Sequence, residues 1–186
     1  MSGHRSTPQA GDEPRLLHRG LKFDLVSSPI ATRGGGSIRR EFVRHPGAVT
    51  VVGLTDRGQI PLVRQYRVAL SGPSLELPAG TISPPETPRD CAARELREET
   101  GYDAATIRTL GRFYPSPGLS DELMHVFAAA DLTHVGQDLE DDESIEVVLR
   151  SPAQIARAIA DGKRRTTSID SSSSKSCPTC VRSAAA

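Results

Sequence analysis

The chain has 186 residues, enough for one domain that buries a sizeable core. Lys and Arg together number 23, as do Asp and Glu, so the formal net charge is zero and no overall field attracts nucleic acid or a membrane surface. No apolar run reaches the roughly 18 residues of a membrane span, and the polar N-terminus lacks the apolar centre of a signal peptide. We therefore expect a soluble, cytoplasmic protein with a small-molecule partner and with no nucleic acid or membrane among its partners.

Three cysteines, Cys91, Cys177 and Cys180, are too few and too unevenly spaced for a disulfide framework. The last two have the spacing of half a zinc site. Zinc usually takes four ligands, however, and the sequence offers neither a second cysteine pair nor a nearby histidine pair. A metal or redox role for these two cysteines is a minor alternative.

The first 45 residues divide into two segments. Residues 1–17 are polar and rich in Gly, Pro and charged residues, which predicts a disordered leader. In residues 18–45, short apolar runs flank the turn Gly34–Gly36. This pattern predicts a β-hairpin.

A second hairpin is predicted near the centre of the chain. Ala48–Leu54 is a continuous apolar run with β-branched residues, and the turn Asp56–Gly58 separates it from the run Gln59–Tyr66. Strand-like stretches recur at 106–114, 123–130 and 144–149. Because convincing helix signals occur only twice, the pattern predicts an α+β fold on a mixed sheet.

The first helix is expected to begin after Thr87, its N-cap residue. Pro88 takes the first helical position, Asp90 stands three residues after the cap, and Gly101 ends the helix. These signals predict a helix over residues 88–100.

The second helix is expected to begin after Ser151, with Gln154 completing a capping box. The turn Asp161–Gly162 ends it. Ile155 and Ile159 are expected to mark its buried side.

Three carboxylates, Glu95, Glu98 and Glu99, share one face of the first helix, because they are three and four residues apart. Like charges at such spacing cost roughly 0.2–0.5 kcal/mol per pair, so a cation should compensate them. Arg94 and Arg97 could do so on an ordinary solvated helix face. Clustered carboxylates are also what Mg²⁺ needs for phosphate chemistry.

The residues that flank this helix favour the metal interpretation. The sequence resembles the Nudix hydrolase family, whose box reads G-x5-E-x7-R-E-U-x-E-E-x-G-U, where U is a bulky apolar residue. The matching positions are Gly80, Glu86, Arg94, Glu95, Leu96, Glu98, Glu99, Gly101 and Tyr102. Agreement at so many fixed spacings is far more specific than a lone glycine motif.

This resemblance implies the Nudix fold, a mixed β-sheet sandwiched between α-helices, here with an N-terminal β-hairpin element. It also implies attack of water on a diphosphate held by Mg²⁺ or Mn²⁺. Carried onto this chain, Glu95 and Glu99 would be the main metal ligands, Glu98 would hold a further ion and act in catalysis, and the carbonyl of Ala79 would complete the site.

Other box residues would have supporting roles. Arg94 would act in catalysis by orienting the carboxylates, and Glu86 would support the motif. Gly80 would let the backbone approach the substrate closely, because glycine lacks a side chain.

Sequence around the box resembles the ADP-ribose pyrophosphatase branch, through LELPAG before it and SPGLSDE after it. The resemblance implies that Pro117, Arg67 and Glu76 lie at the substrate. It also implies that an acidic loop supplies the base, with Glu143 preferred over Glu140. Alternatively, Arg67 is a surface charge at a strand end and the acidic loop is merely solvated.

Members of this branch are commonly homodimers whose N-terminal strands pack across the two-fold axis. Residues 18–45 are therefore expected to form a dimerisation element, and residues 46–163 the catalytic domain. The tail, 164–186, departs from the apolar final helix of relatives and is expected to be disordered. Three aromatic residues could stack on adenine or belong to the core: Tyr66, Phe113 and Tyr114.

Three functions remain possible at this point. The first is Mg²⁺-dependent hydrolysis of ADP-ribose to AMP and ribose 5-phosphate. The second keeps this chemistry for another nucleoside diphosphate derivative: a sugar nucleotide, a dinucleotide or an oxidised nucleotide. The third is a non-catalytic module that binds ADP-ribose; the unusual tail is compatible with it, and the complete set of carboxylates argues against it.

Overall fold

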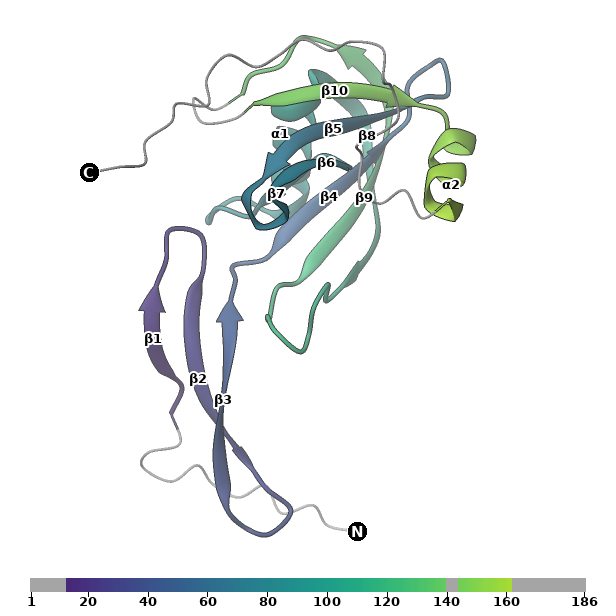
Figure 1. The fold of residues 1–186 in the computed structure, drawn as a ribbon. Helices are drawn as coiled ribbons and strands as arrows, with labels where there is room; N and C mark the ends of the chain where they lie inside the picture. Colours follow the sequence, from purple (N-terminus) through teal and green to yellow (C-terminus); the bar gives the residue numbers. More distant parts are fainter. Residues whose placement is uncertain (1–12, 140–143, 162–186) are drawn as a thin grey trace, which may run out of the picture.

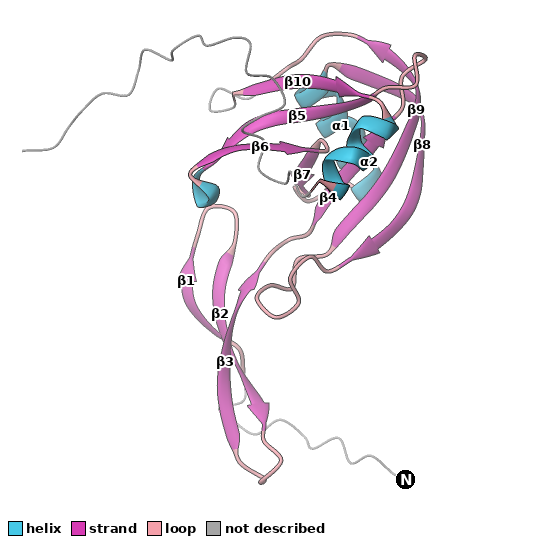
Figure 2. Cartoon of the chain, turned by 45° about the vertical axis from the view of Figure 1, so that its right-hand side comes forward, coloured by secondary structure: helices cyan, strands magenta, loops and turns pink. Residues whose placement is uncertain are grey.

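A computed structural model describes residues 13–139 and 144–161. The strands are β1 (Arg15–Arg19), β2 (Asp24–Ala31), β3 (Ser37–Arg44), β4 (Ala48–Gly53), β5 (Ile60–Arg67), β6 (Gly72–Glu76), β7 (Ala79–Thr81), β8 (Tyr102–Phe113), β9 (Met124–His134) and β10 (Ile145–Arg150). The helices are η1 (Val68–Leu70, a 3₁₀ turn), α1 (Pro88–Thr100) and α2 (Pro152–Ala160). Strands dominate this part of the chain (Figure 2), which confirms the predicted α+β class.

β1, β2 and β3 form an antiparallel sheet, the N-terminal sheet, which projects from the rest of the molecule (Figure 1). β2 and β3 are the predicted hairpin, and hydrogen bonds between Thr32 and Gly36 close its turn. β1 begins at Arg15, inside the segment expected to be a disordered leader. The rest of that leader, residues 1–12, and the tail lie outside the described residues.

The body contains two further sheets. One is mixed, with strand order β7-β4-β9-β8, and β4 runs parallel to β9 within it. The other is antiparallel, with order β10-β5-β6. None of the helices in the described residues is long and apolar enough to cross a membrane.

The second predicted hairpin is wrong, because β4 and β5 belong to different sheets. The turn between them exists, since Thr55 and Gln59 are joined by a backbone hydrogen bond. Yet β4 pairs with β7 and β9, and β5 pairs with β6 and β10, so both edges of each strand are occupied. A tight turn fixes the reversal of the chain, whereas pairing depends on strands far away in the sequence.

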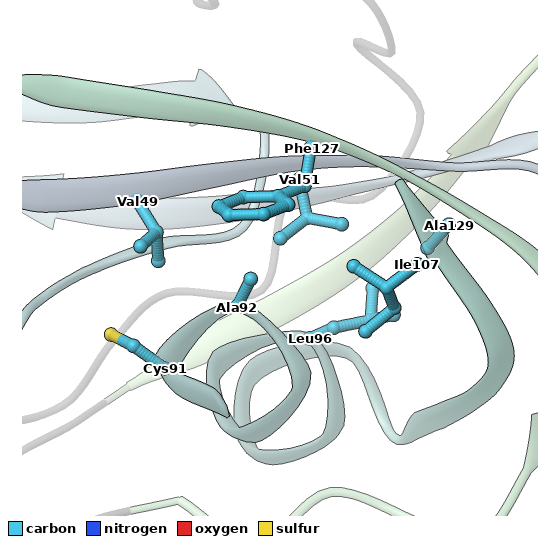
Figure 3. Close-up of a cluster of buried hydrophobic side chains, with 8 residues drawn as sticks. All are labelled: Val49, Val51, Cys91, Ala92, Leu96, Ile107, Phe127 and Ala129. Carbon is cyan, nitrogen blue, oxygen red and sulfur yellow. The ribbon is translucent and has the colours of Figure 1, made fainter. Parts of the chain in front are cut away.

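The core lies between α1 and the mixed sheet (Figure 3). Leu96 and Ala92 of α1 are fully buried, as are Val49 and Val51 of β4. Phe127 of β9 closes the same cluster. Because successive side chains of a strand point to opposite faces, β4 turns Val49 and Val51 toward α1 and Thr50, which lies between them, away from it.

α1 begins and ends where local sequence predicts. The side chain of Thr87 accepts a hydrogen bond from the backbone N–H of Asp90, and Pro88 follows the cap. Gly101 ends the helix with φ 73°, a left-handed conformation that glycine adopts without strain. This capping fixes which residues of the box face the sheet.

α2 has the predicted capping box between Ser151 and Gln154, but its packing differs from the prediction. Ile155 is half-buried, whereas Ile159, expected on the buried side, is 66% exposed. Both line an apolar groove of about 650 Å³, together with residues of β5 and β6 such as Leu62 and Leu75. Periodicity correctly marks the apolar side of α2, but burial also requires a partner segment against that side.

Candidate active site

Gly80 lies directly against the carboxylate of Glu95. Gly80 pairs with Val49 in the ladder of β4 and β7. A Cβ atom added to Gly80 would lie 1.8 Å from Oε1 of Glu95, far inside any allowed contact. The sequence predicts a close approach of Gly80 to the substrate, and the structure shows a close approach of Gly80 to an acid of the site, Glu95.

Glu99 lies one helical turn after Glu95, and both carboxylates are buried, with 3% and 8% of their surface exposed. The backbone N–H of Ala79 donates a hydrogen bond of 2.9 Å to Oε2 of Glu99. Burying a carboxylate is costly unless hydrogen bonds or positive charge compensate it. The structure thus brings three of the predicted metal-site residues together beside β7.

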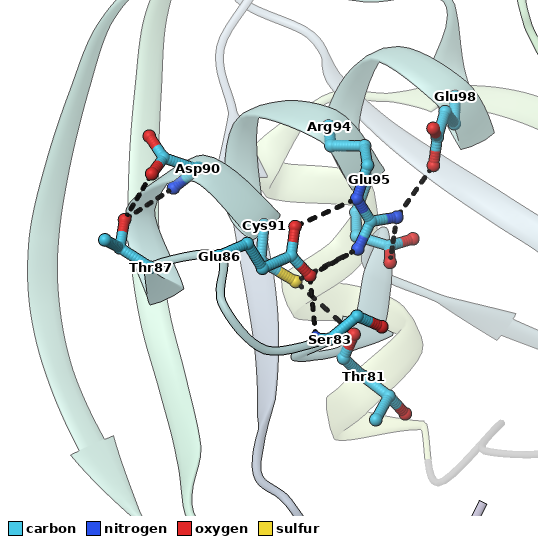
Figure 4. A network of polar contacts seen from close by, with 9 residues as sticks. All are labelled: Thr81, Ser83, Glu86, Thr87, Asp90, Cys91, Arg94, Glu95 and Glu98. Carbon is cyan, nitrogen blue, oxygen red and sulfur yellow. Dashed lines mark hydrogen bonds and ion pairs between the residues drawn. The ribbon is translucent and has the colours of Figure 1, made fainter.

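Arg94 connects the carboxylates of the box (Figure 4). It donates to both oxygens of Glu86, at 3.1 Å from Nε and 2.9 Å from Nη2. Its Nη1 lies 2.8 Å from Oε1 of Glu95 and 2.8 Å from Oε2 of Glu98. One guanidinium thus holds three acids, which is the arrangement that an orienting role requires.

Glu86 anchors this network to the loop before α1. It accepts a further hydrogen bond of 2.8 Å from the backbone N–H of Ser83. Hydrogen bonds from Arg94, and to a lesser extent from Ser83, lower the pKa of Glu86 to about 2 against the opposing effect of burial. The hydrogen bonds to Glu86 in turn raise the pKa of Arg94, so this pair stays ionised across the physiological range.

Cys91 fills the space behind the ion pair. Its thiol donates to the carbonyl of Thr81 at 3.6 Å and accepts from Nη2 of Arg94 at 3.4 Å. Burial, reinforced by the Glu86 carboxylate, raises the pKa of Cys91 to about 12. The thiol is therefore protonated and acts as a small packed side chain, a role that the spacing of cysteines did not indicate.

Gln137 caps the far end of α1, and no sequence signal pointed to it. Its side-chain N–H donates to the backbone carbonyl of Glu99 at 2.7 Å, while the N–H of Asp138 donates to the carbonyl of Glu98 at 3.1 Å. The last carbonyls of a helix lack partners within the helix. The chain after β9 thus holds the end of α1 that carries the acids.

Arg67 and Glu76, expected at the substrate, form a two-point ion pair between β5 and β6. Nε of Arg67 donates to Oε1 at 3.0 Å and Nη2 to Oε2 at 2.6 Å. Burial raises the pKa of Glu76, but hydrogen bonds from Arg67 and Ser74 and the charge of Arg67 outweigh it, so the pKa lies below its ordinary value. The guanidinium of Arg67 is therefore held in a fixed orientation by Glu76 of the neighbouring strand.

Pro117 is exposed in the loop 114–123, between β8 and β9. This loop is hydrogen-bonded to the end of β3 and the start of β4, and Pro117 is part of neither the Arg94 network nor the Arg67 pair. The aromatic candidates are not core residues, because each is about half exposed or more: Tyr66, Phe113 and Tyr114. Glu140 and Glu143, the candidate bases, lie outside the described residues.

The acidic side chains of the site can be compared with the ligands that a divalent metal ion requires. Within residues 13–139 and 144–161, no three His, Cys, Asp or Glu side chains stand close enough to hold a metal as they are placed. Their chemistry fits one nevertheless: Glu95 and Glu99 are buried oxygen donors, and the lack of a side chain at Gly80 makes room for the carboxylate of Glu95. Arg94 supplies the positive charge that the crowded acids require.

Comparisons with known proteins point to one family. The NUDIX domain matches residues 44–168. The ADP-ribose pyrophosphatase of Bacillus subtilis is 41% identical over 134 residues, covering 71% of this chain and 72% of that protein. The ADP-ribose pyrophosphatase of Mycobacterium tuberculosis is 39% identical, covering 79% of this chain and 72% of its own.

A solved structure supports the same fold. The crystal structure of an ADP compounds hydrolase superposes with a TM-score of 0.67 and 25% identity, covering 80% of this chain and 81% of that one. Another similar protein is named for a different substrate: the GDP-mannose pyrophosphatase of Klebsiella pneumoniae is 34% identical over 148 residues, covering 72% of this chain and 74% of that protein.

Proposed function

Because the chain belongs to the Nudix family, and with the box acids gathered around Arg94, we propose that it hydrolyses the pyrophosphate bond of ADP-ribose. Water attacks one phosphorus, the bond between that phosphorus and the bridging oxygen breaks, and the products are AMP and ribose 5-phosphate. The observation that carries this proposal is the buried pair Glu95 and Glu99, held against Gly80 and Ala79. Similarity to two ADP-ribose pyrophosphatases supports the choice of substrate.

Mg²⁺, or Mn²⁺ in its place, is the proposed cofactor. Glu95, Glu98 and Glu99, with the carbonyl of Ala79, would hold it. When bound, such ions neutralise phosphate oxygens and lower the pKa of the attacking water. Hard oxygen donors support this type of ion, since carboxylates and carbonyls suit Mg²⁺ and Mn²⁺ better than they suit soft metals.

The chain's own residues would orient and bind. Arg94 keeps the acids in one geometry, because a single planar guanidinium contacts Glu86, Glu95 and Glu98. Arg67, fixed by Glu76, would meet the charge of the diphosphate, and Pro117 would border the substrate. Glu143 remains the proposed base, ahead of Glu140.

A second candidate substrate follows from the comparisons. The similar GDP-mannose pyrophosphatase supports another nucleoside diphosphate sugar, since the box acts on the diphosphate and other residues choose the base and the sugar. A dinucleotide or an oxidised nucleotide belongs to the same alternative. A module that binds ADP-ribose without cutting it is the remaining alternative.

The N-terminal sheet supports a homodimer. Four large apolar side chains of its strands are exposed, Leu16, Leu17, Ile30 and Ile38, as are Leu21 and Phe23 in the turn between β1 and β2. The sheet projects and exposes apolar residues, and its edge strand β1 pairs only with β2 among the described strands, so it is a surface that a second copy would cover. A cytoplasmic location belongs to the proposal as well, because the free Cys91 fits a reducing compartment.

The test is a product assay. The purified chain is incubated with ADP-ribose with Mg²⁺, with Mn²⁺ and with a chelator, and nucleotides are separated by chromatography beside ADP-glucose, GDP-mannose and a dinucleotide. AMP released fastest from ADP-ribose, and only with metal, is the expected result. Faster cleavage of another substrate would favour the second candidate, and binding of ADP-ribose by a folded chain without turnover would favour the binding module.

A further inference from the structure

The short linker between β3 and β4, residues 45–47, lies between two loops of the body. The carbonyl of Gly47 accepts a hydrogen bond of 3.1 Å from the backbone N–H of Ile82, in the loop before α1. The next residue, Ala48, donates 3.0 Å to the carbonyl of Leu123, at the end of the loop 114–123. A displacement of this linker would therefore reach both loops.

Gly47 makes this junction tight. Its φ of 102° lies in the left-handed region, which side chains disfavour. A Cβ atom there would meet Cδ1 of Ile82 and the carbonyl oxygen of Leu123, each at 3.4 Å. Gly47 is buried, so the two loops and the linker are packed against one another at this point.

The loop 114–123 is also bonded to the end of the N-terminal sheet. The backbone N–H of Val43 donates to the carbonyl of Leu119 at 2.8 Å, and the N–H of Asp121 donates to the carbonyl of Val43 at 3.1 Å. In Figure 1 the loop reaches from the lower end of β8 and β9 toward β3. Among the described residues, these are the backbone bonds that connect the N-terminal sheet to the body.

Asp121 adds a side-chain bond at the same place. Its Oδ1 accepts a hydrogen bond of 2.8 Å from the backbone N–H of His45, the first residue of the linker. Nδ1 of His45 in turn accepts from the N–H of Gly47 at 3.2 Å. One exposed carboxylate thereby ties the loop to the linker that touches the loop before α1.

We propose that Asp121 is a positioning residue, which holds the loop 114–123 in place by accepting the His45 N–H, and that the linker after the N-terminal sheet influences the substrate affinity through this contact. The proposal rests on the proposed function, in which Pro117 of this loop borders the substrate. Asp121 need not touch the substrate or the reacting atoms. Its role is to keep the loop, the linker and the sheet in one arrangement.

The hydrogen-bond geometry predicts a selective effect. An Asp121→Ala variant loses the acceptor, so the loop should sample other positions and the KM for ADP-ribose should rise about five- to tenfold. The acids of α1 do not contact Asp121, so kcat should stay within about twofold. Asp121→Asn keeps an oxygen that can accept from His45 and should restore most of the wild-type KM.

The experiment measures kcat and KM for wild type, Asp121→Ala and Asp121→Asn, with Asp56→Ala as a control, since Asp56 is an exposed acid in the turn between β4 and β5. Amide hydrogen exchange of the folded chains provides a second readout that needs no activity. Exchange at Val43 and His45 should become faster in Asp121→Ala and stay near wild type in the other variants.

Each outcome decides one claim. A wild-type KM in Asp121→Ala overturns the inference, as does a fall in kcat that Asp121→Asn does not restore. If wild type cuts no nucleoside diphosphate sugar, the proposed function fails and the exchange data alone judge the positioning. In that case, an unchanged rate of amide hydrogen exchange at His45 in Asp121→Ala overturns the positioning role of Asp121, and a faster rate supports this role.

Discussion

Glu99 is the most deeply buried acid of the proposed site. Its 3% exposure and its hydrogen bond from the Ala79 N–H fix its carboxylate at the edge of β7. Glu99 carries a negative charge that can attract a cation, and its Oε2 accepts a hydrogen bond from the backbone. Charge and hydrogen bonding can therefore be separated by mutation.

Glu99→Gln should lower kcat on the order of 100-fold or more, because the charge of a proposed metal ligand is removed while an amide oxygen can still accept from Ala79. Circular dichroism should show an unchanged fold. The measurement is steady-state turnover of ADP-ribose at saturating Mg²⁺. Wild-type turnover in this variant would mean that the face of α1 does not hold the metal.

Gly80 offers a second test at the scale of one atom. Gly80→Ala places a Cβ where Oε1 of Glu95 now lies, so the carboxylate must move and activity should fall at least about tenfold. Gly111→Ala is the matched control, because nothing lies within 4 Å of a Cβ at that position. Equal activities of the two variants would contradict the placement of Glu95.

At the scale of the element, α1 depends on the ion pair between Glu86 and Arg94. The folded state lowers the pKa of Glu86 from 4.5 to about 2, so the folded protein binds this proton less readily than the unfolded chain does. The stability contributed by Glu86 is therefore fully present above about pH 4.5 and is lost as the pH falls toward 2.

Glu86→Gln removes this linkage. The variant should be less stable than wild type near pH 7, by roughly 1–3 kcal/mol for a lost charged partner, and the difference should shrink as the pH falls from about 5 to 2. Urea unfolding at several pH values measures it. A difference that stays constant over this range would show that Glu86 stabilises α1 by packing alone.

Sequence predicts α1 and its acids well because their determinants are local. The cap at Thr87, the left-handed Gly101 and the common face of the acids follow from spacing within one helix. The pairing of β4 with β9 and the contact between Gly80 and Glu95 depend on residues far apart in the chain, so sequence reasoning missed both. Likewise, the exposure of Ile159 depends on what packs on α2, which periodicity alone does not specify.

At the scale of the whole molecule, the N-terminal sheet forms a projecting arm with exposed apolar residues (Figure 1), and few hydrogen bonds between described residues join it to the body. Such an arm is an unfavourable feature for a monomer, because apolar surface in water costs about 25 cal/mol per Å². Association of two chains would remove this cost.

Replacing two of these residues tests the dimer. Phe23→Ser with Ile38→Ser should shift the chain toward monomers and raise the dissociation constant at least tenfold, because both side chains are exposed and apolar. Sedimentation velocity over a concentration series measures the shift. Leu110→Ser is the control, because Leu110 of β8 is apolar and even more exposed than these two residues. A wild-type chain that is monomeric at all concentrations would exclude the homodimer.

The groove beside α2 has a thermodynamic consequence. Of the side chains that line it, Leu75 and Ile155 are half-buried and Ile159 is exposed, so they are already partly in contact with solvent in the folded chain. The heat-capacity increment of unfolding arises mainly from apolar surface that becomes hydrated for the first time. The side chains that line this groove therefore contribute less to that increment than the same side chains would if a further segment covered them.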